Sequence, residues 1–257
     1  MSRVEALGRK AERILVAIGV FISFIVGSFA MSDKRFWAQW RYSIVQQGTQ
    51  SLWLVLLSSA FIGMVIGLQG FYILNRFGAE QALGQLIALA MIRELGPVMC
   101  SLFFIGQSCS TITAELALMR ITMQIDSLEV IGVDPRARLV WPRLCAVVFV
   151  APLLISVFIV SAIMGGSMVS IGVLGVDYGA FWSNILSNVD FYNDVCISLF
   201  KGIIFFITAV MIAIYQGYCV EPQVEAVAQA TTRTVVIGSA LTLALDFILT
   251  SFTMTVY

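Results

Sequence analysis

Two full charges stand side by side in an otherwise apolar stretch, MIRELGPVM, at Arg93 and Glu94. An arginine inside a membrane needs a polar or charged partner, and a glutamate there can take up a proton. Gly96 and Pro97 follow at once and loosen the helix, which frees backbone groups that protein or water must receive. These residues are the strongest candidates for a functional site.

The cost of these two charges indicates that they have partners. Each costs at least ~2.5 to 3.5 kcal/mol at the centre of a membrane-spanning helix, and Arg93 lies roughly 12 residues, ~18 Å, into its expected helix. Adjacent residues point ~100° apart on a helix, so the two do not simply neutralise each other. Either a buried structural ion pair or a substrate-facing cavity would supply partners. Asp246, in ALDFILT, is by depth a candidate partner of Arg93.

The composition is that of an integral membrane protein. Of 257 residues, 60% are hydrophobic and 12% charged, with a mean hydropathy of +0.95, against ~45 to 50% and ~25% in soluble domains. The formal net charge is zero and histidine is absent, which excludes a basic nucleic-acid-binding surface and any histidine metal site or general base. The five cysteines are scattered singly, as apolar packing residues rather than zinc ligands or a disulfide framework.

The chain has no G-x-x-x-x-G-K-[ST] segment, so a P-loop is absent. We therefore expect no catalytic residue, no metal ligand and no cofactor in this chain. If transport is driven by ATP, a separate ATPase chain binds the ATP and magnesium.

Five apolar segments reach the ~20 residues that a helix needs to cross the hydrocarbon of a membrane. They are residues 49–73, 82–113, 139–171, 196–219 and 234–256. The expected fold class is an all-α integral membrane protein with five transmembrane helices. We treat residues 1–257 as one domain, with an N-terminal membrane-interface helix region at 1–44 and a five-span core at 45–257.

The apolar run from Ile14 to Met31 has three interpretations. It could be a cleaved signal peptide, a sixth span, or an elbow helix that lies in the cytoplasmic face of the membrane. The elbow helix is favoured because it leaves the basic clusters on both sides of the run inside, with Trp37, Trp40 and Tyr42 as interface anchors.

Basic residues indicate which ends of the spans face the cytoplasm. Of the 15 Lys and Arg, seven lie in residues 1–41, four lie between Arg120 and Arg143, and Arg233 precedes the last span. By the positive-inside rule these segments are cytoplasmic, so the N-terminus is inside and the C-terminus outside. Arg76, Lys201 and the connection at 172–195 then lie outside.

A ridge of small residues marks the first span, where Gly63, Gly67 and Gly70 recur in FIGMVIGLQG. Such a ridge lets two helices approach closely. It is either a dimer seam or tight packing within one chain, and Gln69 beside it needs a polar partner.

A mixed amphipathic segment at residues 113–143 separates the second and third spans. Its charges interleave with apolar residues up to Gly132, which predicts one short helix. The helix could rest on lipid headgroups, but its acids and bases favour docking into a cytoplasmic protein.

The blocks IGMVIGLQG, IRELGPV, TAELALMRITMQIDSLEVIGVDP, ATTRTVV and LDFILT, in this order, resemble the MlaE/YrbE family of permeases. These are membrane subunits of ABC transporters that work with MCE proteins, and the resemblance covers about residues 45–252. It implies transport of phospholipids between the inner membrane and the periplasmic pathway to the outer membrane of Gram-negative bacteria, which maintains outer-membrane lipid asymmetry. The implied partners are a second copy in a homodimer, an MlaF-like cytoplasmic ATPase, an MlaB-like STAS-domain protein bound through the ATPase, and an MlaD-like periplasmic MCE hexamer.

The resemblance also implies roles for residues at matching positions. Arg93 and Glu94 would face a lipid cavity at the dimer axis, and Gly63, Gly67 and Gly70 would line the dimer interface and cavity. The implied lipid contacts on the first span are Ile66, Gln69, Ile73 and Phe77. A coupling helix over about Glu115 to Ile131 would contact the ATPase through Glu115, Arg120, Asp126 and Glu129.

Two rival functions come from other classes of membrane protein. An ion-coupled secondary transporter would use Glu94 or Asp246 to take up a proton, and it would transport without an ATPase. A non-transporting scaffold would only assemble partners, and it would tolerate apolar residues in place of Arg93 and Glu94.

Overall fold

The computed structural model describes residues 34–256, and within that range the chain is helical, with turns between helices and no strand. The α-helices are α2 Lys34–Asn75, α3 Leu83–Ala90, α4 Gly96–Phe104, α5 Ser110–Ile121, α6 Gln124–Val130, α7 Pro135–Leu139, α8 Trp141–Gly172, α9 Tyr178–Asn188, α10 Phe191–Tyr218 and α11 Val224–Val256. A 3-10 turn, η1 Glu80–Ala82, precedes α3. Five helical stretches in this range are long and apolar enough to cross a membrane, which confirms the expected class and number of spans.

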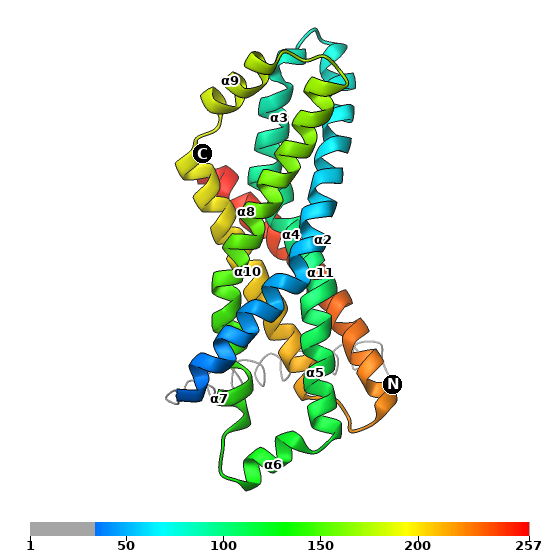
Figure 1. Ribbon diagram of the computed structural model, residues 1–257, viewed down its shortest axis with the longest axis vertical. Coiled ribbons are helices and arrows are strands. Elements are labelled where there is room, and N and C mark those ends of the chain that lie inside the picture. Colours follow the sequence, from blue (N-terminus) through cyan, green and yellow to red (C-terminus); the bar gives the residue numbers. More distant parts are fainter. Residues whose placement is uncertain (1–33, 257) are drawn as a thin grey trace, which may run out of the picture.

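The first span is much longer than expected. Helix α2 runs unbroken for 42 residues, or ~63 Å, about twice the thickness of the hydrocarbon. The expected boundary between residues 44 and 45 therefore falls inside a helix. Figure 1 shows the dark-blue first part of α2 tilted away from the axis of its later, cyan part. The expected elbow helix at 14–31 lies outside the described residues.

The other spans keep the expected order with different ends. The third, Trp141–Gly172, agrees closely with the expected 139–171, and the fourth is Tyr192–Tyr218. Helix α11 begins at Val224 rather than at 234, because part of the polar stretch before the fifth span is also helical. The second span joins α3, α4 and α5 end to end through two π-helical segments, η2 Met91–Leu95 and η3 Ile105–Cys109.

Small residues hold the first and third spans together within one chain. A Cβ on Gly63 would overlap the carbonyl oxygen of Ala162, and a Cβ on Gly165 would overlap that of Ala60. Gly67 is less tightly enclosed, since a Cβ there would lie 3.1 Å from Ser170 Oγ and 3.2 Å from the carbonyl oxygen of Gly166 in α8. The backbones of α2 and α8 thus touch along a small-residue seam, so two glycines of the predicted ridge serve packing within the chain.

A further helix lies in the connection between the third and fourth spans. Asp177 caps α9 by accepting a hydrogen bond from the backbone N–H of Ala180 at 2.8 Å. Phe181 and Ile185 are the buried side chains of α9, and Asn184 donates to the carbonyl of Gln81 at 3.0 Å. This helix was not expected from the sequence, since the segment is too short and too polar to span the membrane.

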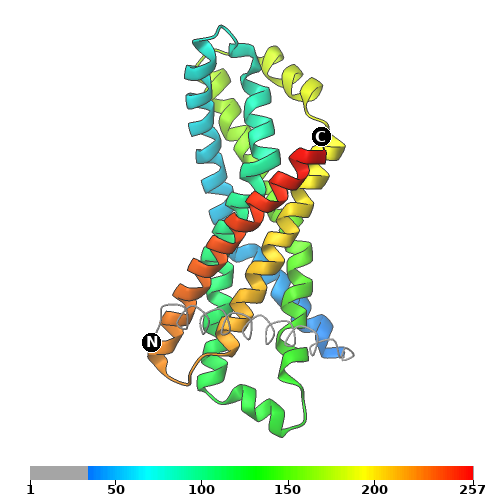
Figure 2. The same ribbon diagram turned by 180° about the vertical axis from the view of Figure 1, so that it is seen from behind.

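The single helix expected between the second and third spans is divided between the end of α5 and α6, and α7 follows before the third span. Helix α5 ends at Ile121, and Met123 adopts φ 56° before α6 starts. A left-handed residue redirects the chain, so the expectation of a single helix from Glu115 to Ile131 is wrong. Figures 1 and 2 show α6 and α7 at the same end of the molecule as the starts of α2 and α11, with α9 toward the opposite end.

We expect Gly165→Ala to lower the stability of the protein by ~1 to 3 kcal/mol, because the new methyl must force α8 away from the backbone of α2. Gly172→Ala is the matched control in the same helix, since a Cβ there has no atom within 4 Å. Thermal unfolding of the detergent-purified protein measures both. Equal unfolding midpoints for the two variants would refute the close seam.

Candidate functional site

The candidate site begins with a proline that breaks the hydrogen-bond ladder of the second span. Pro97 has no N–H to give the carbonyl of Arg93, four residues earlier, and its ring crowds that carbonyl. The chain adjusts by widening into the π-helical segment η2, in which the N–H of Gly96 bonds the carbonyl of Met91. π-helical segments of this kind often occur at functional sites. Arg93 and Glu94 both lie on this segment.

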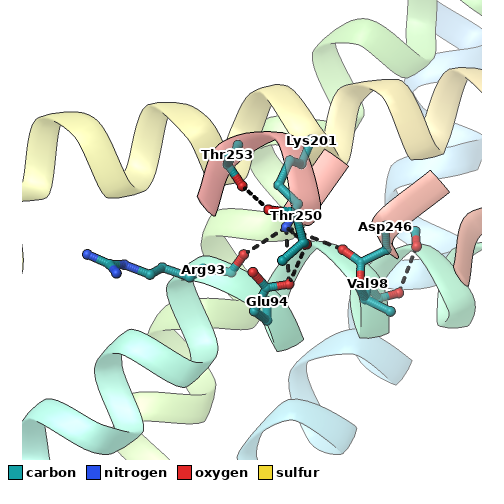
Figure 3. Close-up of polar contacts among 8 residues, drawn as sticks. Arg93, Glu94, Val98, Lys201, Asp246, Thr250 and Thr253 are labelled. Atoms are coloured by element: carbon teal, nitrogen blue, oxygen red, sulfur yellow. Dashed lines mark hydrogen bonds and ion pairs between the residues drawn. The ribbon is translucent and has the colours of Figure 1, made fainter. Parts of the chain in front are cut away.

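Lys201, on α10, is the centre of the polar contacts in Figure 3. Its Nζ donates to the freed carbonyl of Arg93 at 3.3 Å, to Glu94 Oε2 at 3.1 Å and to Thr250 Oγ1 at 2.8 Å. It also forms an ion pair with Asp246 Oδ1 at 3.3 Å. The amine therefore joins the second span to α11 through buried charge and hydrogen bonds. Of the two expected partners for a freed backbone group, protein or water, the Arg93 carbonyl has a protein partner.

Arg93 has a different partner from the one expected. Its Nε donates to Asp194 Oδ1 at 2.9 Å, whereas Asp246 pairs with Lys201. The proposed Arg93–Asp246 pair is therefore wrong. The sequence-based assignment of Lys201 to the outside is also wrong, because Lys201 lies within the fourth span, Tyr192–Tyr218, where its side chain is only 2% exposed. We call Arg93, Glu94, Asp194, Lys201, Asp246 and Thr250 the charged cluster.

Sequence reasoning missed Asp194, Lys201 and Thr250 as members of the charged cluster. Lys201 carried a signal, since a lysine within an apolar run of spanning length is unusual and needs a partner. Thr250 carried none, because threonine is common in such helices.

The charged cluster has a buried side and an accessible side. The side chains of Lys201 and Asp194 are each 2% exposed, whereas Arg93 is 42% and Glu94 37% exposed. In Figure 3 the Arg93 side chain extends away from Lys201, while Glu94 turns toward it. A guanidinium and a carboxylate thus remain accessible within the membrane spans. This arrangement can bind a charged or zwitterionic group.

An apolar groove of about 420 Å³ adjoins the charged cluster between α10 and α11, a size typical of ligand pockets. Its lining residues are Cys196, Ile197, Phe200, Lys201, Leu249, Phe252 and Thr253. Within residues 34–256, no group of three or more acidic, cysteine or histidine residues is placed to hold a metal ion. The chemistry available at the site is ion pairing beside an apolar surface.

The other predicted lipid contacts lie on the second half of α2 and in the turn that follows it. Ile66 is partly buried against the core, Gln69 and Ile73 lie on the exposed side of the helix, and Phe77 lies in the turn that follows. A Cβ on Gly70 would lie closest to the side chains of Leu83 and Leu86, both of α3. Exposed apolar side chains on a span suit lipid contact, so this role stays a prediction for Ile73 and Phe77.

Of the predicted ATPase contacts, Glu115 is engaged inside the chain. It forms an ion pair with Arg143 of α8, 3.2 Å from Nη2 to Oε2, and accepts a hydrogen bond from Gln46 of α2. Arg120 and Asp126 pair across the bend between α5 and α6, 2.6 Å from Nη1 to Oδ1. The first ion pair fixes the start of the segment between the two spans, and the second fixes the bend between α5 and α6.

Glu129 and the end of α6 are accessible. Glu129 is exposed, as are Val130 and Ile131 beside it. An exposed acid next to two exposed apolar side chains is a surface on which another protein can dock. Sequence reasoning identified Glu129 but missed the two apolar residues.

Removing the Lys201 amine alone should destabilise the protein strongly. Lys201→Met leaves Glu94 and Asp246 as unpaired carboxylates, and breaking a buried ion pair in this way costs ~3 to 5 kcal/mol. The triple variant Lys201→Met, Glu94→Gln and Asp246→Asn keeps the shapes without the charges and should recover most of the loss. Thermal unfolding in detergent measures both, and a triple variant no more stable than the single one would contradict the account.

Comparison with known proteins is consistent with the membrane architecture. The family model described as Permease MlaE matches residues 40–252. The chain is 47% identical over 204 residues to the intermembrane phospholipid transport system permease protein MlaE of Haemophilus influenzae, covering 79% of this chain and 78% of that protein. It is 30% identical over 246 residues to a probable ABC transporter permease protein of Rickettsia typhi, covering 95% of each.

A more distant relative comes from a plant. The chain is 27% identical over 237 residues to the chloroplastic protein TRIGALACTOSYLDIACYLGLYCEROL 1 of Arabidopsis thaliana, covering 91% of this chain and 67% of that protein. The match to the family model spans all five membrane-crossing helices except the ends of the first and the last. The chain belongs to the MlaE permease family.

Proposed function

We propose that this protein is the transmembrane permease subunit of an ATP-driven ABC transporter that moves phospholipids. They would travel between the inner membrane and the periplasmic pathway to the outer membrane, which maintains outer-membrane lipid asymmetry. The observation that carries this proposal is the accessible pair Arg93 and Glu94 within the spans of an MlaE-family chain. The 47% identity to a phospholipid transport permease supports the choice of substrate.

The site suits a phospholipid because its charged groups lie beside an apolar groove. The Arg93 guanidinium can bind the phosphate as a charge-assisted fork, and Glu94 lies next to it in the chain. Acyl chains would lie in the apolar α10/α11 groove beside the charged cluster and along the predicted lipid contacts Ile66, Gln69 and Ile73 of α2 and Phe77 in the turn after it.

A homodimer is supported by the exposed apolar face of α11. The part of α11 that crosses the membrane buries a smaller share of its residues than any other of the five described spans. Its exposed residues include Leu243, Phe247 and Phe252. A second copy of this chain packed on that face would enclose the lipid between two charged clusters.

The remaining partners are proposed from two features of the chain, the absence of a P-loop in its sequence and the exposed end of α6. The sequence has no P-loop, so a separate MlaF-like ATPase would supply ATP binding and hydrolysis with magnesium, accompanied by an MlaB-like STAS-domain protein. That ATPase would dock on the exposed end of α6, at Glu129 and Ile131. An MlaD-like MCE hexamer would sit at the opposite, periplasmic end, where α9 lies.

The basic residues support a bacterial inner-membrane location with the N-terminus in the cytoplasm. The starts of α2 and α11 lie at the same end of the molecule as α6 and α7, the end assigned to the cytoplasm.

ATP binding would draw the ATPases together and move α6 and α5. Narrowing of the space around Arg93 and Glu94 would then push the lipid toward or from the MCE channel.

The two rival functions make different demands on the charged cluster. A proton-coupled transporter needs Glu94 or Asp246 to lose and regain a proton without an ATPase. A scaffold needs the charged cluster only for stability. The exposure of Arg93 and Glu94 favours a ligand over a purely structural role, because a structural pair would be enclosed as Lys201 is.

Phospholipid should co-purify with the wild-type complex and be depleted at least several-fold in Arg93→Ala and Glu94→Ala, because each change removes one exposed charge. Mass spectrometry of extracted lipid, at equal recovery of the ATPase, measures this. Equal lipid in all three proteins would move the binding site elsewhere and restore the rival functions.

Ile131→Asp should reduce co-purification of the ATPase by about tenfold, because it places a charge on an exposed apolar docking residue. The control is Leu186→Asp, an equally exposed apolar position on α9 near the other end of the molecule. Pull-down of the ATPase from membranes measures both. The same loss in both variants would indicate general misfolding rather than a docking surface at α6.

A further inference from the structure

The charges of the charged cluster do not balance. Arg93 and Lys201 are its two cations, while Glu94, Asp194 and Asp246 are its three acids. With all five ionised, the cluster carries one excess negative charge. An excess charge in low-dielectric surroundings interacts strongly with any charge brought near it.

The accessible negative charge is on Glu94. Its Oε2 accepts from both Lys201 and Thr250, whereas its Oε1 accepts no hydrogen bond from any residue in 34–256. The other two acids are less available, since Asp194 is enclosed against Arg93 and Asp246 is mostly buried beside Lys201. A ligand that reaches the cluster therefore meets the Glu94 carboxylate.

The accessible positive charge is on Arg93, the residue before Glu94. Its guanidinium is partly exposed and extends away from Lys201 in Figure 3. A ligand at this position thus meets a guanidinium and a carboxylate on neighbouring residues of one helical segment. The complementary ligand carries a negative and a positive charge close together.

We infer that the charged cluster selects phospholipids with a zwitterionic headgroup ending in a primary ammonium, as in phosphatidylethanolamine, over anionic phospholipids such as phosphatidylglycerol. This inference rests on the proposed function, because it names the headgroup that the same site accepts. The phosphate binds the Arg93 guanidinium, and the ammonium donates to Glu94 Oε1 and offsets the excess negative charge.

An anionic headgroup is disfavoured by the same charges. Its phosphate can bind Arg93, but it brings no cation to Glu94, so the excess negative charge of the cluster faces a net negative ligand. Discrimination then comes from the repulsion of the wrong headgroup as well as from the attraction of the right one.

The test uses the full chain in complex with its ATPase, reconstituted in nanodiscs with equal amounts of phosphatidylethanolamine and phosphatidylglycerol that carry identical acyl chains. Mass spectrometry then measures the lipid retained after extraction into detergent. We expect about a tenfold excess of phosphatidylethanolamine in the wild type, equivalent to ~1.4 kcal/mol. Equal retention of the two lipids would overturn the headgroup inference and leave phospholipid transport standing, whereas no retained lipid would overturn both.

Three variants assign the selectivity to particular charges. Glu94→Gln should lower phosphatidylethanolamine about tenfold and, because it also removes the excess negative charge, should not lower phosphatidylglycerol. Arg93→Gln should lower both lipids, because it removes the cation that binds the phosphate of either headgroup. Asp246→Asn removes the excess charge without altering the exposed groups, so it should reduce the preference to a few-fold. Glu221→Gln, at an exposed acid in the connection between α10 and α11, is the matched control and should keep the wild-type ratio. A tenfold preference that stays undiminished in both Glu94→Gln and Asp246→Asn would overturn the inference.

Discussion

A buried lysine amine joins the parts of this molecule that carry its function. Lys201 lies on α10 and contacts a carbonyl and a carboxylate of the π-helical segment η2 and two side chains of α11. An unpaired ammonium within the membrane costs several kcal/mol, so these helices cannot separate unless the amine gains another partner. The contacts also fix how α11 is rotated, because Asp246 and Thr250 are four residues apart and lie on one face of that helix.

The molecule divides into a tightly packed part and a loosely covered part. Helices α2 and α8 meet along a glycine seam that leaves no space for a methyl group, which makes them a rigid frame. Helix α11 lies across the opposite side, held by Lys201 and by contacts with α5 and α10, with much apolar surface uncovered. The charged cluster lies between these parts, where a moving helix can change the access to Arg93 and Glu94 without disturbing the frame.

Hydropathy and residue spacing predicted the class, the five spans and the need of the RELGP charges for partners, because apolar length and the cost of intramembrane charge are local properties of a sequence. They did not predict which charges pair. The partner of Arg93 depends on how distant helices are rotated, and Lys201 was assigned to the wrong location because a count of basic residues ignores depth. The ends of α2 and α11 were missed because hydropathy identifies only the part of a helix that lies in the membrane. The helix itself continues until it reaches a residue that ends it. The break at Met123 has no composition signal, since methionine favours helices.

The order of the charged partners along the chain also bears on how the protein is made. Arg93 and Glu94 enter the membrane with the second span, but Asp194 and Lys201 follow about a hundred residues later, and Thr250 is 156 residues after Glu94. During synthesis the second span is therefore inserted before Asp194, Lys201 and Thr250 are available to its two charges. The apolar turns on either side of RELGP have to supply the favourable insertion energy, and the charged cluster can close only when the last span arrives. Biogenesis of this permease would then be most vulnerable between the second and fifth insertion steps, when a membrane quality-control protease could still recognise a charged cluster that lacks some of its members.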